Sequence, residues 1–141
     1  MFTDNTGIFM EELEKKLEVA LMDIGIMLES EAQKNLTEMG AVDTGLLRNS
    51  ITHAIGGQAP AISSYSADRE SKYGGGTPES GSYSGTVQKK GDGSVSVGTN
   101  VEYGKFIEFG ARGRAERPYL RRAFSENLDK IKEKLENALK E

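Results

Sequence analysis

The most chemically suggestive feature of this sequence is a cluster of arginines. Within eleven residues there are five arginines and a single acid, Glu116, the arginines being Arg112, Arg114, Arg117, Arg121 and Arg122. The planar guanidinium group suits bidentate contacts with carboxylates and phosphates. Three interpretations stay open at this stage: docking to acidic patches of a neighbouring subunit, binding of phosphate, and local pairing with acids of a long N-terminal helix.

Catalytic chemistry has less support in the sequence. A hydrolase could use Asp43, Glu102 or Glu108 together with His53, but no nucleophile and base stand at a recognisable spacing. His53 is the only histidine, and a metal site would need several carboxylates that the spacing does not supply. There is no cysteine, which excludes disulfides and thiolate chemistry. We therefore predict no catalytic site, no metal site and no cofactor.

The length and the charge of the chain further limit which class of protein it can be. The 141 residues suit one domain, and the net charge of -4 is unevenly distributed. Residues 1–40 hold nine acids and three bases, residues 41–125 eight acids and eleven bases, and residues 126–141 five acids and four bases. Gripping duplex DNA usually requires a strongly basic face, so this balance argues against direct DNA binding. No apolar stretch approaches the roughly 18 residues that span a bilayer, and no signal sequence is evident, so we expect a cytoplasmic protein.

Helices at the two ends would position these residues. Apolar residues recur at steps of three and four from about Met10 to about Asn35, which predicts a helix crossing the whole domain. Glutamates 11, 12, 14 and 18 crowd its expected first turns. A second helical pattern begins at Arg117-Pro118, with Pro118 at the first helical position, and continues to the C-terminus. Val101 to Phe109 predicts a short helix whose charged residues, including Glu108, lie on the surface.

Strands and a loop are expected between the helices. Asp43 or Thr44 can cap a short helical turn, which leads into a strand from Ser50 to Ile55. Thr86 to Lys89 and Val95 to Gly98 predict a hairpin that turns at Asp92-Gly93. The fold class is therefore α+β, with a long N-terminal helix and a C-terminal helix packed on a small, mainly antiparallel sheet of at least three strands.

The segment from Gly56 to Gly85 is dominated by Gly, Ser, Pro and Tyr and has no periodicity. This composition predicts a long mobile loop within the single domain 1–141. Its tyrosines, Tyr65, Tyr73 and Tyr83, leave two alternatives open: plain disorder, or a loop that orders when the protein assembles with a partner.

Three motifs in order after a long helix resemble a known family. They are Val42-Asp-Thr-Gly-Leu-Leu-Arg-Asn-Ser-Ile51, Val97-Gly-Thr-Asn-Val-Glu-Tyr-Gly-Lys-Phe-Ile-Glu-Phe-Gly110 and Arg117-Pro-Tyr-Leu-Arg-Arg-Ala-Phe124. Together they look like the tail-component family of long-tailed bacteriophages and prophages, the small head-tail joining, neck or tail-completion proteins. The resemblance covers most of the chain outside residues 56–85.

The resemblance implies a non-enzymatic virion protein, assembled in the bacterial cytoplasm, that forms a homo-oligomeric ring at the head-tail junction. Implied partners are a head-completion or connector protein and a tail-tube or tail-terminator protein, with no membrane and no specific DNA binding, although DNA passes nearby. The motifs and the arginine cluster together give the candidate subunit or partner interface: Asp43, Thr44, Arg48, Tyr103, Glu108, Phe109, Arg112, Arg114, Arg117 and Arg121. The alternative is a small nucleic-acid-binding protein that acts through Arg112–Arg122, with binding that weakens steeply with salt.

Overall fold

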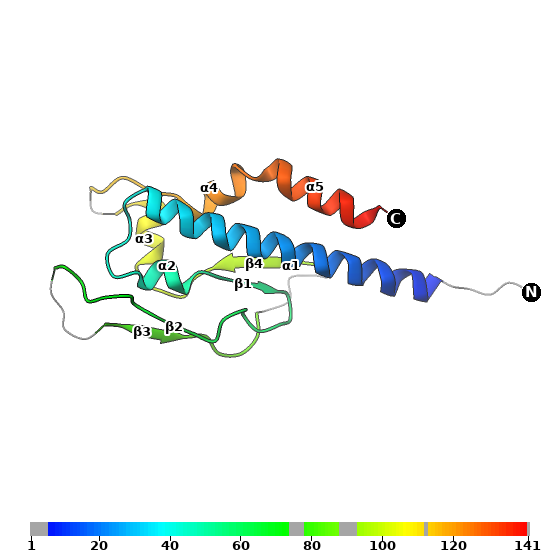
Figure 1. Cartoon of the computed structure of the whole chain (residues 1–141), viewed down its shortest axis with the longest axis horizontal. Helices are drawn as coiled ribbons and strands as arrows, with labels where there is room; N and C mark the ends of the chain where they lie inside the picture. The colour runs from blue at the N-terminus through cyan, green and yellow to red at the C-terminus, as the bar shows by residue number, and fades with distance from the viewer. Residues whose placement is uncertain (1–5, 74–77, 88–92, 112, 141) are drawn as a thin grey trace, which may run out of the picture.

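The computed structural model describes residues 6–73, 78–87, 93–111 and 113–140. One long helix, α1 (Thr6–Glu38), forms the middle layer (Figure 1). The C-terminal helices α4 (Tyr119–Ser125) and α5 (Leu128–Leu139) pack on one side of it, and the strands β1 (Thr52–Ile55) and β4 (Val95–Gly98) pack on the other. The α+β class that we predicted is confirmed.

Helix α1 is longer than its periodicity predicted, because it begins about four residues earlier and ends three residues later. Its 33 residues correspond to a rod of about 50 Å. The first turn contains no acidic residue, so the expected interaction of the glutamates with the start of the helix is wrong. Burial follows the helical period through one stripe of apolar side chains: Ala20, Leu21, Ile24, Leu28, Ala32 and Leu36.

The strands form two small sheets rather than one. Strand β1 pairs antiparallel with β4, with Thr52 opposite Gly98 and Ile55 opposite Val95. Strands β2 (Ser64–Ser66) and β3 (Ser80–Ser82) form a second antiparallel pair. The predicted hairpin is wrong for Thr86 and Val87, which are in no strand, although Val87 exchanges two backbone hydrogen bonds with Gly57 and Gln58. Of its turn at Asp92-Gly93 only Gly93 is described, with a φ of 75°, while Asp92 and the remaining first-strand residues 88–89 lie outside the described residues.

Residues 56–85 were predicted to have no regular structure, and the strands β2 and β3 correct that prediction. Small and hydroxyl side chains concealed these strands from a search for apolar alternation, because only one residue of each strand, Tyr65 and Gly81, is even partly buried. The mobility of this segment stays a prediction.

The C-terminal region contains a short helix α3 (Gly104–Phe109) followed by α4 and α5. We predicted one helix from Pro118 to the end, whereas the structure separates two helices at Glu126 and Asn127. The buried Asn127 side chain donates a hydrogen bond to the carbonyl of Ala123 at 2.7 Å, which satisfies a carbonyl at the end of α4. Pro118 was predicted at the first helical position, but it is the residue before α4, since its ψ of 75° is not helical although its φ of -78° is compatible with a helix.

The core lies where α1, α4 and the short helix α2 (Leu46–Ser50) meet. Its buried members are Ala32, Leu36, Leu47, Ile51, Tyr119 and Ala123. Full burial of each large apolar side chain contributes roughly 1.5–3 kcal/mol. Farther along α1, Gly25 lets the helix approach the sheet, since an added Cβ would lie 3.0 Å from His53 and from Val95. This arrangement fixes α2 and α4 against the C-terminal half of α1, and α3 packs on α4.

Candidate partner-binding groove

The Asp-Thr-Gly turn before α2 is built around Gly45. Its φ is 87°, in the left-handed region that favours glycine, and an added Cβ would lie 2.9 Å from Cγ of Asp68. The Thr44 hydroxyl accepts from the first amide of α2, that of Leu46, at 3.1 Å, while its carbonyl accepts from the amide of Asp68 at 2.7 Å. The N-cap of α2 is Gly45, so neither Asp43 nor Thr44 occupies the cap position; Thr44 provides the predicted side-chain acceptor from one residue earlier, whereas Asp43 accepts from residues 71 and 72 instead.

Asp43 contacts a different segment. Its carboxylate accepts from the Ser71 hydroxyl at 2.6 Å and from the Lys72 amide at 3.4 Å. The Ser71 hydrogen bond lowers the pKa of the Asp43 carboxyl. Asp43 therefore fastens residues 71–72 to the start of the turn.

Asp68 joins the same segment to α2 through a second set of contacts. Arg48 pairs with its carboxylate at 2.5 Å, and the Asn49 amide donates to it at 2.8 Å and to the Ser66 carbonyl at 2.9 Å. The hydrogen bond from Asn49, helped by the charge of Arg48, lowers the pKa of the Asp68 carboxyl. The motif from Asp43 to Asn49 thus holds residues 66–72 in place along one side of α2.

The β2–β3 pair is fastened by tyrosine hydroxyls. Tyr83 donates to the carbonyl of Ser50 at 2.6 Å and accepts from the amide of Asn100 at 3.2 Å. Tyr65 donates to the side-chain oxygen of Asn100, and the two tyrosine rings lie 5.5 Å apart between centroids. Partial burial raises the pKa of both tyrosines. Tyr65 and Tyr83 therefore have intramolecular roles in a segment for which the sequence left plain disorder and ordering against a partner as alternatives.

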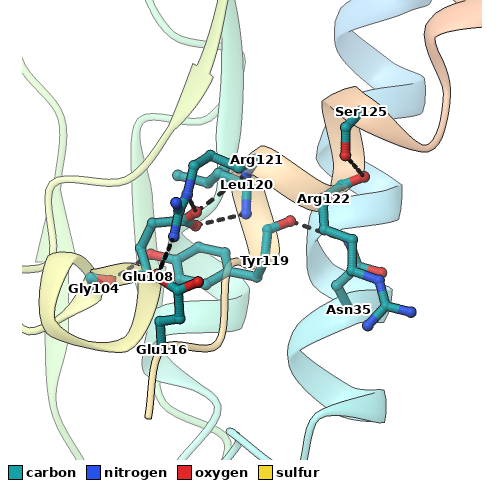
Figure 2. Close-up of polar contacts among 9 residues, drawn as sticks. All are labelled: Asn35, Gly104, Glu108, Glu116, Tyr119, Leu120, Arg121, Arg122 and Ser125. Carbon is teal, nitrogen blue, oxygen red and sulfur yellow. Dashed lines mark hydrogen bonds and ion pairs between the residues drawn. The ribbon is translucent and has the colours of Figure 1, made fainter. Parts of the chain in front are cut away.

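Glu108 was expected on the surface, and the structure corrects this, because the residue is only 3% exposed. Figure 2 shows its carboxylate directed at the start of α4, where it accepts from the amides of Leu120 at 2.7 Å and Arg121 at 3.3 Å. The Nε of Arg121 donates to the same carboxylate at 2.8 Å, and its Nη2 donates to the Glu108 carbonyl at 2.7 Å. Glu108 is therefore a buried cap that joins α3 to α4.

The arginine cluster is partly neutralised within this region. Arg121 pairs with Glu108 and with Glu116, and Arg122 pairs with Glu126 at 2.6 Å. The hydrogen bond to Glu108 is the main reason that the pKa of Arg121 is raised. Among the described residues, none of these partners lies on α1, so local pairing occurs, but with acids other than those we expected. Arg121 also lies over the ring of Phe109, with its guanidinium carbon 4.8 Å from the ring centroid.

A broad groove of about 1440 Å³ lies beside these networks. It is lined by the turn before α2, by residues 69–73 and 78–79, by α3 and by the connection from α3 to α4. Its wall includes the exposed aromatic side chains of Tyr73, Tyr103 and Phe106. Partial burial raises the pKa of Tyr103, whose side chain is 40% exposed. The groove thus offers aromatic area together with a mixture of charges.

The structure separates the predicted interface residues into two groups. Six of them line the groove, namely Asp43, Thr44, Arg48, Tyr103, Arg114 and Arg117. Glu108, Phe109 and Arg121 lie together at the α3–α4 junction (Figure 2 shows Glu108 and Arg121), and Arg112 lies outside the described residues. Sequence reasoning missed Asp68, which follows no recognisable spacing from its partners in the motif.

The described residues that line the groove include no histidine. His53 lies away from it, with Nδ1 3.2 Å from Glu29 of α1. Among residues 6–73, 78–87, 93–111 and 113–140, no three His, Asp or Glu side chains are grouped so that they could hold a metal ion. No helix in the described part of the chain is long and apolar enough to cross a membrane. The geometry is that of a small α+β protein with a groove whose walls are held by hydrogen bonds and ion pairs.

Comparison with known families agrees with the sequence motifs. Residues 3–110 match the family described as "Bacteriophage HK97-gp10, putative tail-component". The match covers more than three quarters of the 141 residues, and the chain belongs to this family of bacteriophage tail components. The family that we identified from the motifs is thus confirmed, with helices α4 and α5 outside the matched span. No curated protein and no solved structure matches the chain.

Proposed function

We propose that this tail component is a non-enzymatic subunit of a homo-oligomeric ring at the head-tail junction of a phage or prophage particle, where it completes the tail or joins it to the head. Its partners there would be a head-completion or connector protein on one side and a tail-tube or tail-terminator protein on the other. DNA would pass through the ring without specific binding.

The observation that carries this proposal is the presence of two unlike exposed surfaces at opposite ends of α1. The groove is lined in part by Gly40 to Gly45, which directly follow the C-terminal end of α1, and the exposed glutamates at 11, 12 and 14 lie near its N-terminal end. Figure 1 shows these two ends of α1 far apart. A head-to-tail interface needs two such different surfaces on each subunit, and it closes into a ring when the rotation between neighbours permits. The internal ion pairs of Arg121 and Arg122 leave fewer arginines for phosphate, which disfavours the nucleic-acid-binding alternative.

The direct test is electron microscopy of particles produced after in-frame deletion of the gene, with the intact gene supplied in trans as the control. We expect separate DNA-filled heads and finished tails, and joined particles again when the gene is restored. Intact infectious particles from the deletion strain would overturn the proposed function.

A further inference from the structure

The N-terminal turns of α1 extend beyond the rest of the fold. Figure 1 shows them projecting past both the strands and α5, and the first buried residue of α1 is Ala20. Among residues 7 and 9–19 of α1, whose burial is described, Leu13 and Leu17 are half-buried and the others are exposed. Leu17 lies beside Gly93, and Glu18 accepts a hydrogen bond from the Gln58 side chain at 2.8 Å, so the described turns before Leu17 have little tertiary packing to stabilise them in water.

The projecting turns have the composition of a docking segment. Phe9 and Met10 are 59% and 45% exposed, and the glutamates at positions 11, 12 and 14 are exposed beside them. Exposed apolar side chains next to each other, bordered by charge, mark a contact surface more often than a solvated face. This segment presents one aromatic side chain, one flexible apolar side chain and a concentration of negative charge.

The groove at the other end of α1 has more positive than negative charge, with five bases and three acids among its described lining residues. Arg69, Arg114 and Arg117 line it, and none of the three forms an ion pair with any other described residue. Phe106 and Tyr103 supply apolar surface in the same wall, at 52% and 40% exposed. Apolar contact beside charges of opposite sign is the arrangement that gives both affinity and correct orientation.

We propose that residues 9–14 of one copy dock into this groove of the next copy. The occupant is a second copy because the two surfaces lie at opposite ends of a helix of about 50 Å, so one chain cannot close the contact on itself. Every subunit then offers one helix end and one groove, which is the heterologous contact that a ring requires. This inference rests on the proposed ring function and names the surfaces that meet in it.

Because the chain has no cysteine, engineered cysteines give a clean test. Particles would be produced with the double variant Met10→Cys/Phe106→Cys, treated with a short bis-maleimide and analysed by denaturing electrophoresis. We expect a ladder of covalent oligomers, since residue 10 is in the N-terminal turns of α1 whereas residue 106 is in α3, which lies at the other end of this helix of about 50 Å (Figure 1). The matched control is Leu139→Cys/Phe106→Cys, which places an equally exposed cysteine at the end of α5 and should give no ladder.

A charge exchange tests the same contact without cross-linking. Glu12→Lys/Glu14→Lys and Arg114→Glu/Arg117→Glu should each reduce incorporation into particles by about tenfold, since two surface ion pairs are worth up to about 1.4 kcal/mol. The chain that carries all four changes should recover. Co-expression of the two double variants should also recover, because each then provides the surface that the other lacks. Glu133→Lys/Glu136→Lys, on the exposed side of α5, is the control and should assemble normally.

The outcomes separate this inference from the proposed function. If the chain is present in particles but the Met10 and Phe106 cysteines give no ladder and the exchanged charges do not recover, the inference is wrong and the groove serves another virion protein or DNA. If the wild-type chain is absent from particles altogether, both the inference and the proposed function fail.

Discussion

Replacing Glu108 with glutamine tests the buried cap that joins α3 to α4. The side chain is 4% exposed, and its carboxylate is shared among the amides of Leu120 and Arg121 and the Arg121 side chain. Glutamine preserves the size of the side chain but removes the charge. It also replaces one acceptor oxygen with an NH2 group, which must then face donors that already point at the site.

The expected loss follows from these contacts. A helix cap contributes about 1 kcal/mol and a hydrogen bond to a charged group about 1.5–3 kcal/mol. The Arg121 side chain is half exposed and can regain water, which limits the penalty. We therefore expect Glu108→Gln to lower the free energy of unfolding by about 2–3 kcal/mol.

Urea unfolding followed by circular dichroism measures this loss. With an m value of about 2 kcal/mol per M, the midpoint should fall by about 1 M or slightly more. The matched control is Glu116→Gln, which removes the other carboxylate paired with Arg121, 3.2 Å away but 57% exposed. It should cost less than about 0.5 kcal/mol. Equal midpoints for the two variants would refute the assignment of Glu108 as a buried cap.

Three further substitutions test other close contacts. Gly104→Ala should cost about 1–3 kcal/mol of stability, since the added Cβ would lie 2.8 Å from the Tyr119 hydroxyl. Adding Tyr119→Phe to the same chain should recover part of that loss, and the urea midpoints of the single and double variants would show it. Gly45→Ala should cost about 1–3 kcal/mol in the same assay, because alanine is strained at a φ of 87° and its methyl group would meet Asp68. Asp68→Asn should destabilise residues 64–73 locally at pH 7, with an effect that diminishes as the pH falls below 3.8. Because the folded-state pKa of Asp68 is lowered, the ionised carboxylate contributes to stability above pH 3.8, and this contribution is lost as the pH falls through the folded-state pKa. Amide hydrogen exchange of residues 64–73, measured as a function of pH, would show this loss.

For each of these three predictions, one result would contradict it. An unchanged midpoint for Gly104→Ala would show that α3 and Tyr119 are not in close contact. Wild-type stability of Gly45→Ala would mean that the turn has an ordinary backbone conformation. If the difference in hydrogen exchange between Asp68→Asn and the unaltered chain did not change with pH, the ionised carboxylate of Asp68 would not be what holds residues 66–72 in place.

Periodicity predicted the helices well, for a physical reason. The stripe from Ala20 to Leu36 is buried on one side, so the apolar repeat recorded in the sequence is the packed face itself. The break between α4 and α5 was not predictable in this way, because the apolar repeat continues through it. It depends on a single buried hydrogen bond from Asn127 to Ala123, which leaves no periodic signal.

The candidate site was predictable only in part. The motif around Asp43 and the residues Tyr103, Arg114 and Arg117 were identified from the sequence, and the fold brings them to one groove. Glu108 was assigned to the surface because Tyr103, Phe106 and Ile107 were interpreted as the packed face of the helix, whereas its burial depends on contacts with the start of α4. The β2–β3 pair was missed because its contacts are tyrosine hydroxyls bonded to distant backbone and side-chain groups, which composition alone does not reveal.

Cryo-electron microscopy of the head-tail junction in purified particles tests the central claim most directly. We predict a ring of copies of this chain at the junction, with the N-terminal turns of α1 from each copy seated against α3 and residues 113–117 of its neighbour. A junction that contains no density for this chain would contradict the proposed function. A ring whose copies meet through other surfaces would retain that function and contradict the docking of α1 in the groove.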